Sequence, residues 1–574
     1  MTAPVPPRAP SPSAPSPAGS TRPLDAVALD LVALLLVIGL ALLLWPRTAV
    51  PPGVDLPAPP WWGGLRDLLL EGPDAAQWAE NAQRMADRAY DRLDAHRMPS
   101  WLLLVAAFVR QGWTVVEAGH VVNRAMFVVA AVGTYALGRL TGSRATGIAA
   151  AAIVLAHPHL QLGTQRFGID ASIEAMLPLA LAAGCLVGWR WGLGLVAGWL
   201  AGWVMFLHHT TIPFLAPVVL LALVTGGPGW RRWAGAATLL VGAGMVLAAL
   251  MQIHPLPTLP QVVAVVQEGA HPGSAAVQGG TESTLSTIQA QLVARFPVAV
   301  ATLVDQMSGS QVPSSALFWL LGLGVVGPLL AARTPRARAL VSGGPAVRRV
   351  LGRQLLHGAA VGVILLACLA PLPVLAALDA PPRYGNNLLG IVAVLVARGG
   401  VSALTTLEHV TLGLWARWPR GLASAIGAVA LLGATARAGL THTAPPPPLG
   451  DDVVGFYQLG HALETTFPRG AGVDCPVTEA LMQAGLRPCT PEHCPRGSDE
   501  ASLLHCVRAL AAACTVDGTV GYVSLPGHNM YDPNSPGRPA LDAWVAERVP
   551  PTAQVRNGNF SATLYRIPVS LVGP

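Results

Sequence analysis

Apolar runs of nearly membrane-spanning length recur along the chain and define its expected architecture. The first extends from about Ala26 to Trp45, and further runs, including one from Ala145 to Leu160, lie between Val115 and Ala436. Each approaches the roughly 20 residues with which an α-helix crosses a hydrocarbon core. The segment from Trp101 to Val109 covers only half a span, so we expect it at the interface or re-entering the membrane. The pattern predicts a polytopic α-helical membrane protein with about 11 transmembrane helices.

A change in composition separates the C-terminal part of the chain from these apolar runs. After a run of four prolines, apolar and charged positions alternate as in a small soluble domain with mixed α and β structure. The expected division is a disordered N-terminal tail at 1–23, a transmembrane domain at 24–440, a proline-rich linker at 441–449 and the soluble domain at 450–574. Outer loops of the transmembrane domain are expected at 46–114, 157–170, 252–314 and 379–386.

Charge gives the expected orientation in the membrane. All 36 basic residues are arginines, and those in the short loops between the apolar runs are concentrated in alternate loops. By the positive-inside rule this places the N-terminus in the cytoplasm and the C-terminal domain on the outer side of a bacterial inner membrane. The arginines form no basic face interleaved with aromatic residues, so we expect no nucleic-acid partner despite a pI near 9.2.

Cysteines are concentrated in the C-terminal domain. Five of the seven are Cys475, Cys489, Cys494, Cys506 and Cys514. In an oxidising compartment this density favours two disulfides and one remaining thiol, with the pairing undetermined. A metal site is the alternative, since a histidine precedes two of these cysteines, but the spacing matches no standard zinc ribbon. A divalent metal therefore stays possible as a cofactor, and no organic cofactor is indicated.

The first outer loop contains a charged amphipathic segment from Gly72 to Tyr90. Its apolar positions share one helical face, and Glu80 and Arg84 form an i,i+4 pair on another. We expect this helix to lie on the membrane with its charges in water. Asp74 stands at its start, after Gly-Pro, where it either caps the helix or takes part in chemistry.

The second outer loop adds candidate polar groups to the same side. It contains Arg166, Asp170 and Glu174, with the two acids one helical turn apart. The plain alternative is that Asp170 caps the next helix and Arg166 reaches for lipid headgroups. His208 and His209 end another span at the outer surface and are secondary candidates for contact with phosphate or a metal.

One arginine lies within an apolar span and needs a partner. Arg124 follows Glu117 by seven residues, which places both on one helical face. Because an intramembrane charge is costly unless paired, we expect Arg124 to pair with Glu117.

Four segments together resemble the GT-C membrane glycosyltransferases. They are PDAAQWAENAQRM, HRMPSWLLL, QRFGIDASIEAMLPLALA and PPRYGNNLLG. The likeness is greatest to the protein mannosyltransferase and aminoarabinose transferase group, whose donors are sugars on a polyprenyl phosphate. The resemblance implies that Asp74 is the base, with Asp170 as a second catalytic carboxylate. It also implies that Arg166, Arg383 and Tyr384 bind the donor phosphate.

The first loop departs from that family in one position. Family members commonly have Asp followed by Glu, whereas here Asp74 is followed by Ala75. Glu80 or Asp170 is the candidate replacement for the missing carboxylate.

The function implied is transfer of a sugar from a polyprenyl phosphate to a lipid, protein or polysaccharide acceptor on the outer face of the membrane. The expected partners are the polyprenyl-linked sugar and membrane lipids. Two alternatives stay open: a polytopic transporter or lipid flippase, or an inactive GT-C-like scaffold that presents the C-terminal domain.

Overall fold

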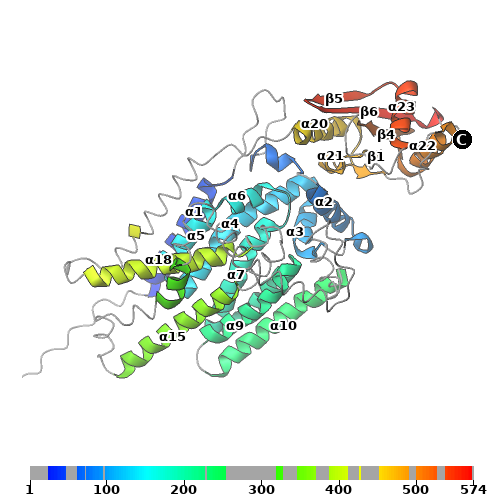
Figure 1. Cartoon of the computed structure of the whole chain (residues 1–574). Helices are drawn as coiled ribbons and strands as arrows, with labels where there is room; N and C mark the ends of the chain where they lie inside the picture. The colour runs from blue at the N-terminus through cyan, green and yellow to red at the C-terminus, as the bar shows by residue number, and fades with distance from the viewer. Residues whose placement is uncertain are drawn as a thin grey trace, which may run out of the picture.

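Apolar helices form the N-terminal part of the protein, and a small domain with a β-sheet forms the C-terminal part (Figure 1). The computed structural model describes residues 23–46, 61–70, 73–94, 97–226, 229–253, 319–327, 345–369, 387–411, 426–427, 451–489, 499–525 and 537–571.

Three helices are long and apolar enough to cross a membrane: α4 (Val115–Thr141), α7 (Asp170–Trp189) and α10 (Trp230–Ile253). Counting one bent helix pair as a further span gives up to four within the described ranges. Large apolar side chains on α1 (Pro23–Leu43) and α10 are exposed, as expected for surfaces that contact lipid. The chain is thus a multi-pass helical membrane protein, and the total of about 11 spans stays a prediction.

The apolar run from Ala145 to Leu160, expected as one span, is broken in the structure. It forms α5 (Arg144–Ala156) and α6 (Pro158–Gln165), with a bend of 57° between them. Pro158 causes the break, because it lacks the backbone N–H that would continue the α5 ladder. The bend leads α6 into the second outer loop.

Helix α4 lies at the centre of the bundle. It packs against α1, α5 and α7, and also against α3 (Pro99–Val109) and α18 (Leu389–Thr411). Gly133 permits the closest approach to α7, since a Cβ there would lie 2.9 Å from the Leu179 nitrogen. Further helices among the described residues are α8 (Gly194–Met205), α9 (Leu215–Thr225) and α15 (Pro345–Ala367).

The C-terminal domain is a mixed sheet with helices, as the sequence pattern predicts. Its helices are α20 (Asp451–Thr466), α21 (Thr478–Gln483), α22 (Glu500–Cys514) and α23 (Gly537–Arg548). Its strands are β1 (Gly472–Asp474), β2 (Arg487–Pro488), β3 (Thr515–Val516), β4 (Thr519–Ser524), β5 (Ala553–Asn557) and β6 (Phe560–Pro568). The strand order is β2-β1-β4-β6-β5. Strand β1 is parallel to β2 and β4, whereas β4, β6 and β5 are antiparallel.

Disulfides fasten the C-terminal domain. Cys489 and Cys514 are bonded to each other, and Cys506 is also disulfide-bonded, to a partner outside the described residues. Cys494 lies outside the described residues as well. Cys475 is a buried free thiol.

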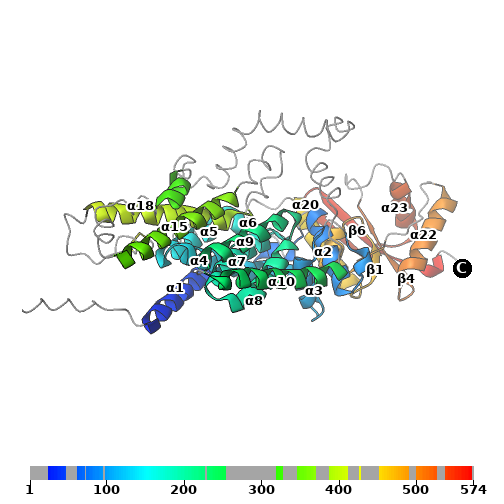
Figure 2. The same cartoon turned by 90° about the horizontal axis from the view of Figure 1, so that it is seen from below.

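The two domains touch at α2 (Pro73–Ala86), as both views show (Figure 1, Figure 2). Helix α21 packs on α2 and α4, and Met482 joins the apolar cluster of the membrane domain. A second contact joins Leu69 to Tyr457. The C-terminal domain therefore covers the end of the bundle at which the first loop lies.

This packing corrects the expected position of the amphipathic helix. Trp78, Ala82 and Met85 are buried, and Trp78 meets Trp101 of α3 edge-on at 5.6 Å between ring centroids. The many alanines of α2 allow close approach on more than one side, so it packs between α3 and α21. Its apolar face thus contacts protein, where we had expected membrane. Glu80 and Arg84 form the expected ion pair.

Candidate active site

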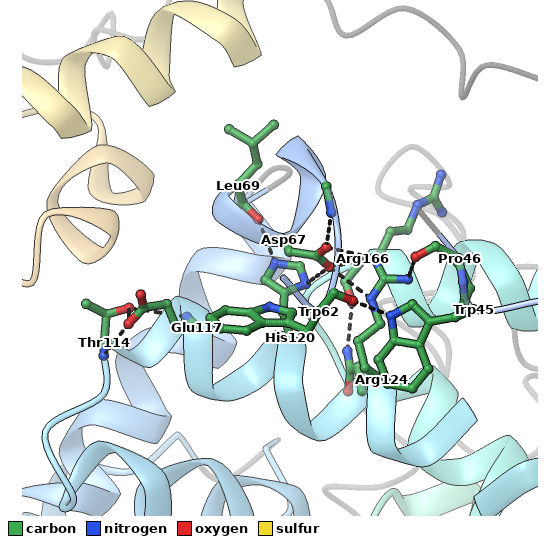
Figure 3. Close-up of polar contacts among 12 residues, drawn as sticks. Trp45, Pro46, Trp62, Asp67, Leu69, Thr114, Glu117, His120, Arg124 and Arg166 are labelled. Carbon is green, nitrogen blue, oxygen red and sulfur yellow. Dashed lines mark hydrogen bonds and ion pairs between the residues drawn. The ribbon is translucent and has the colours of Figure 1, made fainter. Parts of the chain in front are cut away.

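A buried ion pair ties the first loop to α4 (Figure 3). Arg124 donates from Nη2 to both carboxylate oxygens of Asp67, at 2.6 and 2.8 Å, and from Nη1 to the Pro46 carbonyl. The Gly64 N–H also donates to Asp67, at 2.5 Å. Asp67 and Arg124 are both fully enclosed, so each supplies the counter-charge that the other needs.

The predicted pairing of Arg124 with Glu117 is therefore wrong. Glu117 is the third residue of α4, and its carboxylate accepts hydrogen bonds from the backbone N–H of Thr114 at 3.1 Å and from its hydroxyl at 2.8 Å. This reciprocal capping box engages the carboxylate at the helix end, two turns away from Arg124. The actual partner, Asp67, is 57 residues from Arg124 along the chain.

The same face of α4 also holds the second loop in place. The Asn123 side chain donates to the backbone carbonyl of Arg166 at 2.8 Å and accepts from the Trp101 indole at 3.0 Å. One turn earlier, the His120 Nε2 donates to the Leu69 carbonyl at 3.1 Å. Helix α4 is therefore the frame that brings the first loop, α3 and the second loop together.

A cavity of about 260 Å³ lies between α2, the second loop and the start of α7. Its polar lining residues are Asp74, Arg97, Arg166, Asp170, His208 and Asn387. Three helices begin at the cavity: α2 near Asp74, α7 at Asp170, and α18 just after Asn387. Helix N-termini carry partial positive charge and unpaired N–H groups, which favour an anionic ligand.

Arg97 and Asn387 are the two polar lining residues that the sequence did not predict, and Arg97 is the one that contacts Asp74. Its Nη2 lies 2.5 Å from the Asp74 carboxylate, and a second hydrogen bond of 2.5 Å reaches the Gln77 side chain. The guanidinium also lies over the Trp78 ring, 4.8 Å from its centroid. Arg97 precedes Met-Pro at the start of α3, in a turn that the resemblance had included without naming this residue.

The other predicted lining residues come from the ends of α6, α7 and α8. Arg166 is the C-cap of α6, and Asp170 is the first residue of α7. His208 follows α8, and its Nδ1 accepts from the Thr210 N–H at 3.3 Å, which places the proton of the neutral ring on Nε2. Asp74, Arg166, Asp170 and His208, predicted from three separate loops, thus line one cavity.

Other predicted residues lie elsewhere or outside the described ranges. Glu80 pairs with Arg84 on another face of α2 and does not line the cavity. Glu174 is buried one turn beyond Asp170. Arg383, Tyr384 and the side chain of His209 lie outside the described residues, although Asn387, close after Tyr384 in sequence, lines the cavity.

The described residues include no group of three or more His, Cys, Asp and Glu side chains placed to hold a metal. The cavity instead combines a half-exposed carboxylate, Asp74, with guanidinium groups and helix N-termini. Such a site can bind an anionic group and hold a proton acceptor beside it.

Comparison with known proteins gave structural matches only. No protein-family model and no curated protein matches the sequence. ArnT from Cupriavidus metallidurans bound to undecaprenyl phosphate is similar at a TM-score of 0.47 and 12% identity, over 94% of this chain and 98% of that one. The archaeal oligosaccharyltransferase AglB from Archaeoglobus fulgidus, in complex with an inhibitory peptide and a dolichol-phosphate, matches at a TM-score of 0.46 and 12% identity. That match covers 87% of this chain and 69% of AglB.

Both matched proteins are GT-C-fold glycosyltransferases, the group that the sequence segments resemble. At TM-scores below 0.5, the function has to be inferred from the residues of the cavity.

Proposed function

We propose that this protein is a membrane glycosyltransferase that moves a sugar from a polyprenyl-phosphate donor to an acceptor hydroxyl. One observation carries the proposal: the Asp74 carboxylate and the guanidinium groups of Arg97 and Arg166 line one cavity at which three helices begin. The arginines and helix ends suit the donor phosphate, and the carboxylate suits the acceptor proton.

In the proposed reaction the acceptor oxygen bonds to the anomeric carbon of the sugar as the bond from that carbon to the phosphate oxygen breaks. Asp74 takes the acceptor proton as general base. The polyprenyl phosphate leaves with the bonding electron pair, and Arg97 and Arg166 stabilise the charge that grows on it. Asp170 is a second carboxylate at the cavity, and Arg383 and Tyr384 are proposed as further phosphate ligands.

Arg97 has a particular place in this scheme because it already contacts Asp74. An arginine bonded to the base orients the carboxylate while the cavity is empty. When the donor phosphate arrives, the same guanidinium can bind it through its other N–H groups. The contact therefore places the proton acceptor next to the leaving group.

The site is proposed to face the outer side of a bacterial inner membrane. Helix α7 begins at the cavity and ends at Trp189, where α10 also begins. That far end carries Arg190, Arg231 and Arg232 together with the exposed rings of Trp189, Trp191, Trp230 and Trp233. Tryptophan is enriched at both membrane interfaces and arginine in the cytoplasmic loops, so this end fits the cytoplasmic interface and supports an outward-facing cavity and C-terminal domain. The acceptor is a lipid, protein or polysaccharide.

The test is sugar transfer by the full chain reconstituted in vesicles with radiolabelled polyprenyl-phosphate hexoses and pentoses and an envelope extract as acceptor source. Asp74→Asn is expected to abolish transfer, because the amide cannot take the proton, while leaving folding and insertion intact. Glu80→Gln is the matched control: it alters an acid of the same helix outside the cavity and should keep wild-type turnover.

Two outcomes would contradict the proposal. Turnover retained by Asp74→Asn would remove Asp74 from the reaction. Uptake of labelled substrate without any glycosylated product or released polyprenyl phosphate would favour the transporter or flippase alternative.

A further inference from the structure

Asn387 is a buried amide at the cavity with an unused hydrogen-bond acceptor. It precedes α18 and lines the cavity, yet only 5% of its surface is exposed. Its Oδ1 has no hydrogen-bond partner among the described residues. A buried acceptor left unpaired is costly, so a group of this kind inside a cavity wall points to a ligand that supplies the missing donor.

A second buried polar atom without a partner among the described residues lies on the adjacent helix. Glu174 is 2% exposed, and its Oε2 has no hydrogen-bond partner within the described part of the chain. It follows Asp170 by one turn of α7, just beyond Ile173, which lines the cavity.

Contacts between α7 and α18 place Asn387 and Glu174 on the same side. Both helices begin at the cavity, and a Cβ at Gly390 of α18 would lie 2.3 Å from the Pro178 ring of α7. Glu174 lies one turn before Pro178, and Asn387 lies three residues before Gly390. Both therefore lie on the cavity side of the point where the helices touch.

We propose that Asn387 and Glu174 bind hydroxyl groups of the transferred sugar, an inference that rests on the proposed function. A ring hydroxyl of a sugar supplies the donor that the Asn387 Oδ1 lacks, and a second hydroxyl, which can both donate and accept, can bond to the Glu174 carboxyl group. The donor phosphate cannot bond to the Asn387 Oδ1, because both groups are hydrogen-bond acceptors. The sugar thus lies beside Asn387 and Glu174, and the phosphate lies toward Arg97 and Arg166.

This arrangement makes Asn387 a specificity-determining residue. A site built to bind a hydroxyl discriminates strongly against the analogue that lacks it, because the buried acceptor is then left unpaired. Replacing Asn387 with leucine, which has a similar size and no acceptor, removes that penalty. The variant should therefore lose most of its preference for the sugar that has the hydroxyl over the analogue that lacks it.

The experiment first identifies the polyprenyl-phosphate hexose or pentose from which the wild type transfers most efficiently. It then measures kcat/KM for this donor and for its monodeoxy analogues. The wild type is expected to prefer the full sugar over one or two of these analogues by about 10- to 100-fold. For Asn387→Leu and Glu174→Leu, the corresponding ratio should fall to near 1. Ser172→Ala is the matched control, since its buried hydroxyl also has no hydrogen-bond partner among the described residues, but it lies on the opposite side of α7 from Asp170 and Glu174.

The outcomes separate this inference from the function on which it rests. Transfer by all variants with the deoxy preferences of the wild type would overturn the hydroxyl contacts and leave the glycosyltransferase intact. Absence of transfer by the wild type from every donor would overturn the proposed function and the inference together. If Asn387→Leu fails to insert, Asn387→Ser, which shortens the side chain and moves its polar atom back, should show the same loss of preference.

Discussion

Removing the charge of Asp67 should destabilise the membrane domain far more than removing a surface charge. Asp67→Asn leaves the side-chain shape nearly unchanged but deprives Arg124 of its counter-charge. Asp67 is 0% and Arg124 1% exposed, and the guanidinium donates to both carboxylate oxygens. Water therefore cannot take over the solvation of Arg124 without opening the loop.

The magnitude follows from this burial. Breaking a buried ion pair by neutralising one partner typically costs about 3–5 kcal/mol, since it leaves an uncompensated charge. The surface pair of Arg548 and Glu500, 3.1 Å apart in the C-terminal domain, gives the comparison. Its acid is two-thirds exposed, so Glu500→Gln should cost less than about 1 kcal/mol.

The assay is unfolding of the purified full chain in mixed micelles, followed by tryptophan fluorescence, for Asp67→Asn and Glu500→Gln, for the single variants Asp67→Leu and Arg124→Met, and for the double variant that combines the last two. The double variant removes both charges and should be more stable than either single variant of the pair. A cost for Asp67→Asn no larger than that of Glu500→Gln would refute the reasoning. Additive costs in the double variant would refute the direct coupling.

Two further predictions concern the C-terminal domain. Met482→Asp should loosen the contact of α21 with α2, because it places a charge in an apolar cluster, and limited proteolysis should then release the domain faster than in Met482→Leu. Burial raises the pKa of the Cys475 thiol to about 12, so at pH 8 the folded protein should resist maleimide at this position until it is denatured. Because this folded-state pKa exceeds the ordinary thiol value, the associated stability is complete below about pH 8.5 and is lost as the pH rises toward 12. Peptide mapping after labelling checks the reactivity, and labelling of the native protein at pH 8 would contradict the prediction.

The cavity could be predicted in part because its residues stand at helix ends. Asp74, Arg166 and Asp170 each lie next to a helix boundary that the sequence marks with proline or a change of polarity. Loops on one side of a membrane have to converge, so their polar groups were expected to face one another. Convergence of these polar groups can therefore be predicted without knowing how the helices pack.

Other features required the folded chain. Arg97 lies in a short turn without periodicity, and only the packing of α2 on α3 brings it to Asp74. Asp67 and Arg124 are far apart in sequence, so the sequence alone favoured a partner for Arg124 on its own helix. That residue, Glu117, is instead bonded to Thr114 in the capping box at the start of α4. The amphipathic pattern of α2 predicted a buried face correctly, but a pattern does not distinguish lipid from protein as the surface that covers it.

The position of α2 between the two domains has a consequence for how the protein is made. Its outer surface is covered by a segment that the ribosome synthesises some 400 residues later. Until α21 arrives, the helix that carries Asp74 is supported on one side only. The full support of the proposed catalytic carboxylate is therefore complete only after the C-terminal domain has been synthesised, so a truncated chain should hold α2 less firmly.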